Sequence, residues 1–272
     1  MWRRRRDAEL PLIIGHRGAS AVESENSLAA FTRARADGAD GVELDVMTCG
    51  TGEIVVFHDD DLVRLGARPE KIAGTSFAVL RGVTLTSGAK IPTLEEVFEA
   101  CGPDMLVNVE LKVPNRGPAV LAPLVDGVAA IVERAGAGGR VLVSSFNPFA
   151  VRLWMRRSPA VPAGLLFEHQ SPMPLRRAWA AAMLRPFALH PELVLCTADS
   201  VTAWHRRGYM VNVWTVDDPD AVAACRRMGV DSVITNDPAQ AGDVSSGSGG
   251  GWLYNVTTGN VWIDGADPLY KY

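Results

Sequence analysis

The sequence predicts a (β/α)8 TIM barrel. Apolar runs typical of buried strands alternate with helical patterns along the chain, and eight such strands fall within about 240 residues. That number of strands, most of them followed by a helix, is typical of a barrel of this size. A doubly wound sheet is the alternative, and the even spacing of the strands favours the barrel.

Each expected strand is a short apolar run bounded by turn-forming residues. The eight runs are Leu12–Ile14, Gly41–Met47, Met105–Lys112, Val141–Phe146, Ala163–Phe167, Ala188–Leu195, Met210–Val216 and Ser232–Thr235. A further extended run, Ile54–His58, follows the second strand after a Gly-Thr-Gly turn. Residues 59–90 contain four glycines and are expected to be irregular.

Capping and stop signals bound the expected helices. Thr93 is followed three residues later by Glu96, which is the pattern of a capping box, and Asp218 precedes Pro219 as a helix start. The other expected helices are Leu28–Asp37, Ala119–Ala135, Pro148–Arg157, Leu175–Leu184, Ser200–Arg207 and Asp217–Met228.

The composition changes at Ser245. Residues 245–251 read Ser-Ser-Gly-Ser-Gly-Gly-Gly, which is typical of a flexible linker. Beyond it, Trp252–Asp264 alternates aromatic and polar residues and predicts a small β-hairpin that is unlikely to fold alone. We therefore expect a barrel at 1–244, a linker at 245–251 and a hairpin tail of unknown role at 252–272.

Composition excludes several classes of protein. The net charge of −4 gives no reason to expect a nucleic-acid partner, and the basic run Arg3–Arg6 is interpreted as a solvated tail. No stretch has the roughly 20 apolar residues of a membrane span, so we expect no stable membrane insertion. The four cysteines lack CxxC spacing and are interpreted as free thiols, which favours a cytoplasmic location.

Ionised residues interrupt two of the apolar strands. Glu43 and Asp45 are two residues apart and therefore project from the same face, as do Glu110 and Lys112. Three carboxylates meeting at one barrel mouth would repel each other, and one divalent cation would relieve the repulsion. Oxygen-only ligands favour Mg²⁺ or Ca²⁺. The alternative is that these carboxylates form structural ion pairs with Arg17 and Lys112.

Two histidines follow expected strands directly. His16 ends the first strand and His58 ends the extended run, and imidazole suits proton transfer near neutral pH. Arg17 and Lys112 add fixed positive charge that suits a phosphate ester. A simple surface turn is the alternative interpretation of Gly-His-Arg-Gly. The remaining histidines are interpreted as surface or packing residues: His169, His190 and His205.

An ordered set of motifs covers residues 12 to about 242 and resembles the glycerophosphodiester phosphodiesterase family of phospholipase-C-like barrels. The motifs are His16-Arg17-Gly18, Glu25-Asn26-Ser27, Glu43-Leu44-Asp45, His58-Asp59, Ile91-Pro92-Thr93-Leu94-Glu95-Glu96, Glu110-Leu111-Lys112, Ser144-Ser145-Phe146, Val213-Trp214-Thr215-Val216 and Thr235-Asn236-Asp237-Pro238. One departure is Ser24, where the family usually has proline.

The resemblance implies a role for each candidate residue. His16 and His58 would be the acid–base pair, Glu43, Asp45 and Glu110 the metal ligands, and Arg17 and Lys112 would lie near the phosphate. Trp214 would line the substrate cleft, and a core position is the alternative for this residue.

The activity implied is metal-dependent hydrolysis of small glycerophosphodiesters, such as glycerophosphocholine or glycerophosphoethanolamine. The products would be glycerol 3-phosphate and an alcohol. One alternative is a lysophospholipase D that uses the same residues on a lipid. The other is a catalytically silent barrel that acts as a binding module.

Overall fold

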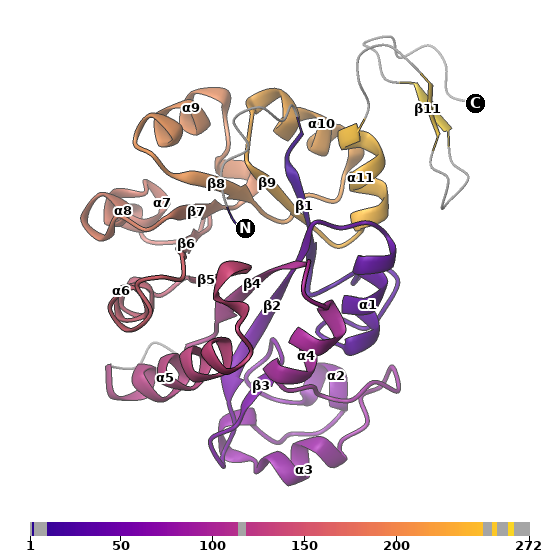
Figure 1. Cartoon of the computed structure of the whole chain (residues 1–272), viewed down its shortest axis with the longest axis vertical. Coiled ribbons are helices and arrows are strands. Elements are labelled where there is room, and N and C mark those ends of the chain that lie inside the picture. The colour runs from indigo at the N-terminus through magenta and orange to yellow at the C-terminus, as the bar shows by residue number, and fades with distance from the viewer. Residues whose placement is uncertain (1, 3–9, 114–117, 247–251, 255–260, 264–272) are drawn as a thin grey trace.

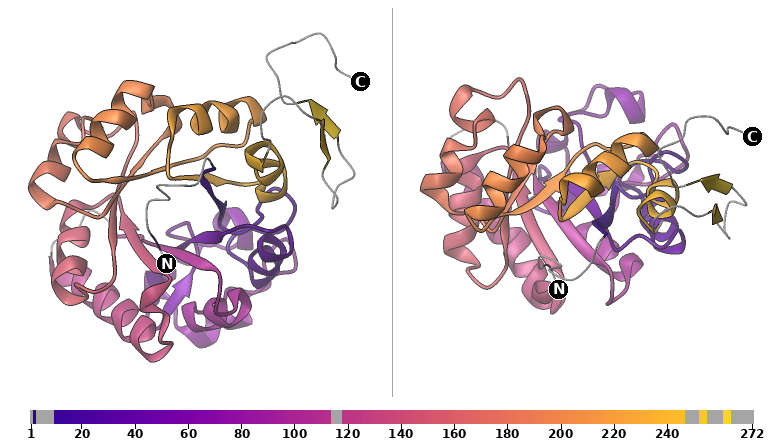
Figure 2. Two further views of the ribbon diagram at one scale, coloured as in Figure 1. Left: turned by 45° about the horizontal axis from the view of Figure 1, so that its top comes forward. Right: turned by 90° about the horizontal axis from the view of Figure 1, so that it is seen from above.

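Eight parallel strands form a closed barrel with helices around its outside (Figures 1 and 2). Figure 1 shows the computed structural model, which describes residues 2, 10–113, 118–246, 252–254 and 261–263. The barrel strands are β1 (Leu12–His16), β2 (Gly41–Thr48), β4 (Leu106–Leu111), β5 (Val141–Ser145), β6 (Ala163–Phe167), β7 (Ala188–Pro191), β8 (Met210–Val213) and β9 (Ser232–Thr235). Strand β1 pairs with both β2 and β9. This closure confirms the TIM barrel and excludes the doubly wound sheet.

Helices connect the strands and cover the barrel. The longer ones are α1 (Leu28–Ala36), α4 (Leu94–Cys101), α5 (Pro118–Arg134), α6 (Pro148–Arg157), α9 (Ala198–Arg206), α10 (Pro219–Met228) and α11 (Pro238–Ser246). The expected caps are present: Thr93 and Glu96 form a reciprocal capping box at α4, and the Asp218 side chain caps α10. Short 3₁₀ turns lie at Ile72–Gly74, Ala137–Gly139 and Leu193–Leu195.

Residues 54–91 form a small unit beside the barrel. Strand β3 (Ile54–Val56) pairs antiparallel with β2, and the segment expected to be irregular contains the short helices α2 (Val63–Gly66) and α3 (Phe77–Gly82). Buried side chains of this unit form an apolar cluster with two residues from the end of β2 and just after it: Met47, Cys49, Val55, Phe57, Leu62, Ile72, Leu80, Val83, Leu85 and Ile91. This cluster fixes the loop that carries His58.

Four sequence predictions need correction. The helix expected at Leu175–Leu184 is two short helices, α7 (Met173–Arg176) and α8 (Trp179–Leu184), because Ala178 adopts a left-handed φ of 54° between them. The strand expected at Ala188–Leu195 ends at Pro191, and the one at Met210–Val216 ends at Val213. The expected run Ile54–His58 likewise ends as a strand at Val56.

Trp2 closes the amino-terminal end of the barrel. Its side chain is 5% exposed and packs with apolar residues that begin the strands, among them Leu12, Leu106 and Met210. Its indole Nε1 donates a hydrogen bond of 2.8 Å to the carbonyl oxygen of Arg140. The interpretation of Arg3–Arg6 as a solvated tail falls on residues outside the described part of the chain.

The tail contains two short strands, β10 (Trp252–Tyr254) and β11 (Val261–Ile263), which pair antiparallel as the hairpin prediction requires. Helix α11 extends to Ser246, two residues into the expected linker, and residues 247–251 lie outside the described part of the chain. All four cysteines are free thiols. Within the described residues, no helix is long and apolar enough to span a membrane.

Candidate active site

The register of the parallel strands gathers the predicted site residues at the carboxyl end of the barrel. His16 on β1 is the partner of Glu43 on β2, and Asp45 on β2 is the partner of Glu110 on β4. One carboxylate oxygen from each of Glu43, Asp45 and Glu110 lies within 4.8 Å of the others, and all three residues are buried. The predicted convergence of the carboxylates is therefore present in the structure.

Mutual repulsion makes these carboxylates hard to ionise together. Burial, together with the charges of Asp45 and Glu110, raises the pKa of Glu43. Burial also raises the pKa of Glu110 to about 7, although Lys112 opposes the shift. Asp45 differs, because the charges of Lys112 and Arg17 outweigh its burial and lower its pKa. A trio with this surplus of negative charge fits a divalent cation.

Arg17 and Lys112 neutralise part of that charge. Lys112 Nζ lies 3.4 Å from Asp45 and 3.2 Å from Glu110, and Arg17 Nε lies 3.3 Å from Asp45. The backbone N–H of Arg17 donates to Glu43 at 3.1 Å. The ion pairs of Arg17 and Lys112, which were the alternative interpretation, are thus present together with the convergent trio. Because two cations stand against three carboxylates, the group keeps a net negative charge.

Glycine shapes the loop that carries His16 and Arg17. Gly18 has a φ of 83°, and a Cβ there would lie 2.5 Å from the carbonyl carbon of Ala30 on α1. The loop therefore packs tightly on α1, which any other side chain at this position would prevent. Asn26 in the same loop donates through Nδ2 to Asp45 at 2.8 Å and accepts from the Asp45 backbone N–H at 3.3 Å.

His16 is held by residues from the last two β–α loops. Its Nδ1 lies 2.7 Å from Oδ1 of Asn236, and the Asn236 amide nitrogen donates to Asp217 at 2.6 Å. Because Asp217 fixes the amide orientation, Asn236 presents its oxygen to His16 as an acceptor. Burial and the charge of Arg17 lower the pKa of His16. The neutral ring therefore carries its hydrogen on Nδ1 and directs the Nε2 lone pair toward Glu43, 4.0 Å away.

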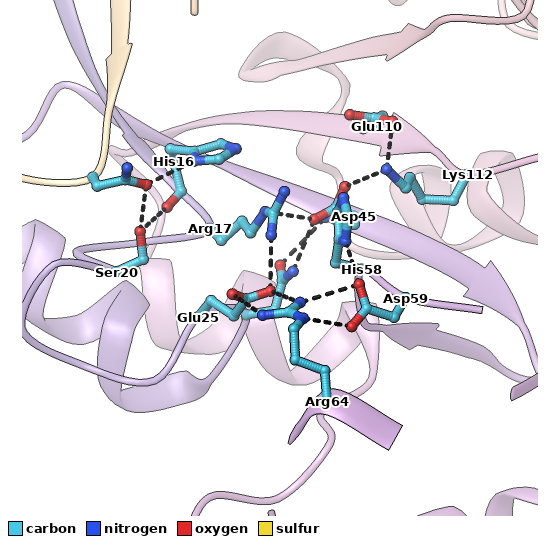
Figure 3. Close-up of polar contacts among 12 residues, drawn as sticks. His16, Arg17, Ser20, Glu25, Asp45, His58, Asp59, Arg64, Glu110 and Lys112 are labelled. Atoms are coloured by element: carbon cyan, nitrogen blue, oxygen red, sulfur yellow. Dashed lines mark hydrogen bonds and ion pairs between the residues drawn. The ribbon is translucent and has the colours of Figure 1, made fainter. Parts of the chain in front are cut away.

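His58 has a carboxylate partner instead. Its Nδ1 lies 2.6 Å from Oδ1 of Asp59, and Arg64 donates to the other oxygen of Asp59 at 2.6 Å. Arg64 also donates to both oxygens of Glu25, at 2.8 and 2.7 Å, as Figure 3 shows. Glu25 in turn accepts from Arg17 at 2.8 Å. Arg64 thus joins the loop of His58 to the loop of His16.

Burial alone would raise the pKa of Glu25. Hydrogen bonds from Arg64 and the charge of Arg17 outweigh this effect and lower the pKa to about 2. Arg64 lies in the short helix α2 and Asp217 in a loop, and neither belongs to a periodic pattern. Sequence reasoning included Glu25, Asn26, Asp59 and Asn236 only as parts of motifs and missed Arg64 and Asp217. Arg64 contacts Glu25, 39 residues away, and Asp217 contacts Asn236, 19 residues away, so periodic spacing carries no signal for them.

The predicted site residues line one cleft of about 1010 Å³. His16, Arg17, Glu43, His58, Glu110 and Lys112 lie along it, and the carboxylate of Asp45 is buried among Arg17, Lys112 and Asn26. Trp214 also lines the cleft, while its Nε1 donates to the carbonyl oxygen of His190 at 2.8 Å. Among the other histidines, His190 is fully buried, His205 contacts Asp231 at 2.8 Å and His169 contacts Glu192 at 2.7 Å.

Comparisons with known proteins agree with this geometry. Residues 16–240 match the family model described as "Glycerophosphoryl diester phosphodiesterase family". A glycerophosphodiester phosphodiesterase of Caldanaerobacter subterraneus is 32% identical over 84% of this chain and 94% of its own length. A probable glycerophosphodiester phosphodiesterase 2 of Mycobacterium tuberculosis is 31% identical over 83% of this chain and 87% of its own length.

Solved structures of phosphodiesterases are also similar to this chain. An Oleispira antarctica phosphodiesterase in complex with the product sn-glycerol 3-phosphate has a TM-score of 0.78 at 27% identity, covering 86% of this chain and 96% of that one. A glycerophosphodiester phosphodiesterase from Thermotoga maritima has a TM-score of 0.68 at 29% identity, covering 84% of this chain and 96% of that one.

The closed barrel and the charged cleft at its carboxyl end define a TIM-barrel phosphoric diester hydrolase. Because the family model matches residues 16–240, the chain belongs to the glycerophosphodiester phosphodiesterase family.

Proposed function

We propose that this enzyme hydrolyses glycerophosphodiesters, such as glycerophosphocholine or glycerophosphoethanolamine, to glycerol 3-phosphate and an alcohol. The observation that carries the proposal is the convergence of Glu43, Asp45 and Glu110 in a cleft that His16 and His58 also line. Arg17 and Lys112 in the same cleft suit the non-bridging oxygens of a phosphodiester.

The carboxylate trio would hold one divalent cation, Mg²⁺ or Ca²⁺. When bound, the cation polarises the phosphoryl group and neutralises developing negative charge. The buried, mutually repelling oxygens described above fit such an ion, and the absence of sulfur and nitrogen donors in the trio favours a hard cation.

The surroundings of the two histidines support a different role for each. His16 Nε2 accepts the proton of the nucleophile, which is either water or the neighbouring glycerol hydroxyl; the hydroxyl gives a cyclic phosphate, which water then opens to glycerol 3-phosphate. The nucleophile oxygen bonds to phosphorus and the bond from phosphorus to the leaving alcohol oxygen breaks. His58, whose Nδ1 lies 2.6 Å from Asp59, donates its Nε2 proton to that oxygen. Arg17 and Lys112 stabilise the charge that accumulates on the phosphoryl oxygens.

The test is whether the full chain hydrolyses glycerophosphocholine, and the measurement is the release of glycerol 3-phosphate. Activity should disappear with excess EDTA and return with Mg²⁺ or Ca²⁺, and elemental analysis should find bound metal. Full activity in a protein shown to retain no metal would contradict the role of the trio.

The same groups would also serve a lysophospholipase D reaction, because only the substituent on the glycerol differs. Apolar side chains favour this second candidate, since Leu121, Phe149 and Leu175 line the cleft and Phe149 is 69% exposed. The same assay with lysophosphatidylcholine as the substrate distinguishes lysophospholipids from small glycerophosphodiesters.

A further inference from the structure

The two halves of the cleft differ in chemistry. Strands β1 to β4 and the residues that directly follow them supply the histidines, carboxylates and cations of the proposed reaction. Strands β5, β6 and β8 are followed directly by Phe146, Glu168 and Trp214, which line the same cleft. Among the described cleft residues that follow these three strands, Glu168 alone is charged at neutral pH.

The alternation of β6 directs Glu168 into the cleft. A Cβ on Gly164 would lie 2.5 Å from the ring of the buried His190, so Gly164 faces the barrel interior. Leu166, two residues later, lines the cleft, and Glu168 follows on the same face. The Glu168 backbone N–H donates to Oγ of Ser171 at 3.1 Å, which fixes the backbone at this turn.

No described residue forms an ion pair with the half-buried Glu168 carboxylate. Arg176 on α7 instead donates to the carbonyl oxygen of His169, at 3.3 Å. Glu192, at the end of the next strand, provides a contrast because it accepts from both the backbone N–H and the ring of His169, at 2.8 and 2.7 Å. A carboxylate that faces a cleft without such a partner favours a cationic ligand.

Two aromatic rings line the cleft with this carboxylate. The rings of Phe146 and Trp214 meet edge to face, with centroids 5.4 Å apart. The hydrogen bond from Trp214 Nε1 to the His190 carbonyl fixes the indole, so the aromatic surface is preformed. Aromatic faces attract alkylammonium groups, which a neighbouring carboxylate also attracts.

We propose that Glu168, Phe146 and Trp214 form a subsite for an ammonium group carried by the alcohol portion of the substrate. The inference rests on the proposed function. A diester of this kind has a negative phosphate and a positive ammonium, and the cleft has cations at one half and Glu168 at the other. The enzyme therefore prefers diesters of choline- or ethanolamine-type alcohols over diesters of uncharged alcohols.

The experiment compares kcat/KM for glycerophosphocholine and glycerophosphoglycerol in wild type and in Glu168→Gln. The substitution removes the charge and keeps the shape. We expect kcat/KM for glycerophosphocholine to fall about 3- to 10-fold, through KM, while that for glycerophosphoglycerol stays within about 2-fold. Tetramethylammonium should inhibit the wild type competitively and inhibit Glu168→Gln less strongly.

Two further variants test whether the preference depends on Glu168 or on another carboxylate near the cleft. Glu192→Gln removes a neighbouring carboxylate that is already paired with His169, and it should leave the substrate preference unchanged. Asp60 is exposed and lines the histidine side of the cleft. If Asp60→Asn removes the preference and Glu168→Gln does not, the ammonium binds on the other side and the subsite is wrong.

The two proposals fail in different ways. If metal-supplied wild type hydrolyses neither diester, the proposed function is wrong. If it hydrolyses both, and Glu168→Gln changes both equally, the function stands and the subsite is wrong.

Discussion

Nδ1 of His16 lies 2.7 Å from Oδ1 of Asn236, which is 220 residues further along the chain. The contact exists because β1 pairs with β9 and closes the barrel, so the loops that follow the first and last strands are neighbours. It fixes the tautomer of His16, and with it the nitrogen available to accept a proton.

Asp217→Asn should lower kcat about 10- to 100-fold, as is typical when a group that orients a reactive histidine is changed. Without the carboxylate, the Asn236 amide can rotate and donate to Nδ1, which moves the histidine hydrogen to Nε2. Nitrogen NMR of His16 reports the tautomer directly. Asp218→Asn is the matched control, because Asp218 caps α10 and asparagine caps equally well. Unchanged kcat in a folded Asp217→Asn enzyme would contradict the positioning role.

Replacing either histidine should reveal its role. His16→Ala and His58→Ala should each lose at least about 10²–10⁴-fold in kcat, with metal affinity little changed. The double variant should fall well short of the product of the two losses, because paired groups act as a unit.

A substrate with a good leaving group separates the two roles. With a p-nitrophenyl ester, which needs no proton on its leaving oxygen, His58→Ala should recover part of its activity and His16→Ala should recover less. The reverse pattern would exchange the assigned roles. A loss of only a few-fold in both single variants, with metal and fold intact, would contradict the acid–base mechanism itself.

His190 should make the fold sensitive to acid. Burial lowers its pKa to about 3, and its Nε2 accepts from Asn212 at 3.0 Å, so the folded state keeps the ring neutral. The unfolded chain takes up a proton below the ordinary pKa of about 6.5, which favours unfolding as pH falls from there toward 3. In that window the free energy of unfolding should fall by up to about 1.4 kcal/mol per pH unit more in wild type than in His190→Gln. Denaturant titrations at several pH values measure both slopes, and parallel slopes would show that His190 is not the responsible group.

Truncation after Ser246 should leave turnover of small diesters largely intact. The cleft is lined by residues of the barrel, and α11 ends at Ser246. The measurement is kcat/KM for glycerophosphocholine in the full and truncated chains, with circular dichroism to confirm folding. A folded, truncated protein without activity would show that residues 247–272 contribute to the site.

Local sequence patterns predicted much of the fold. The spacing of Glu43 and Asp45 placed both on one strand face, the box of Thr93 and Glu96 marked the start of α4, and His16 marked the end of β1. These features depend on residues within a few positions of each other, which is the range over which periodicity and capping act.

Tertiary structure alone decided the rest. Nothing in the sequence near Ala178 signals the left-handed turn that divides the expected helix. Trp2 is buried only because it packs against apolar residues at the amino-terminal end of the barrel. The partners of His16 and Arg64 were likewise beyond prediction. Strand register and barrel closure determine which loops meet at the cleft, and those long-range contacts form no repeating pattern along the chain.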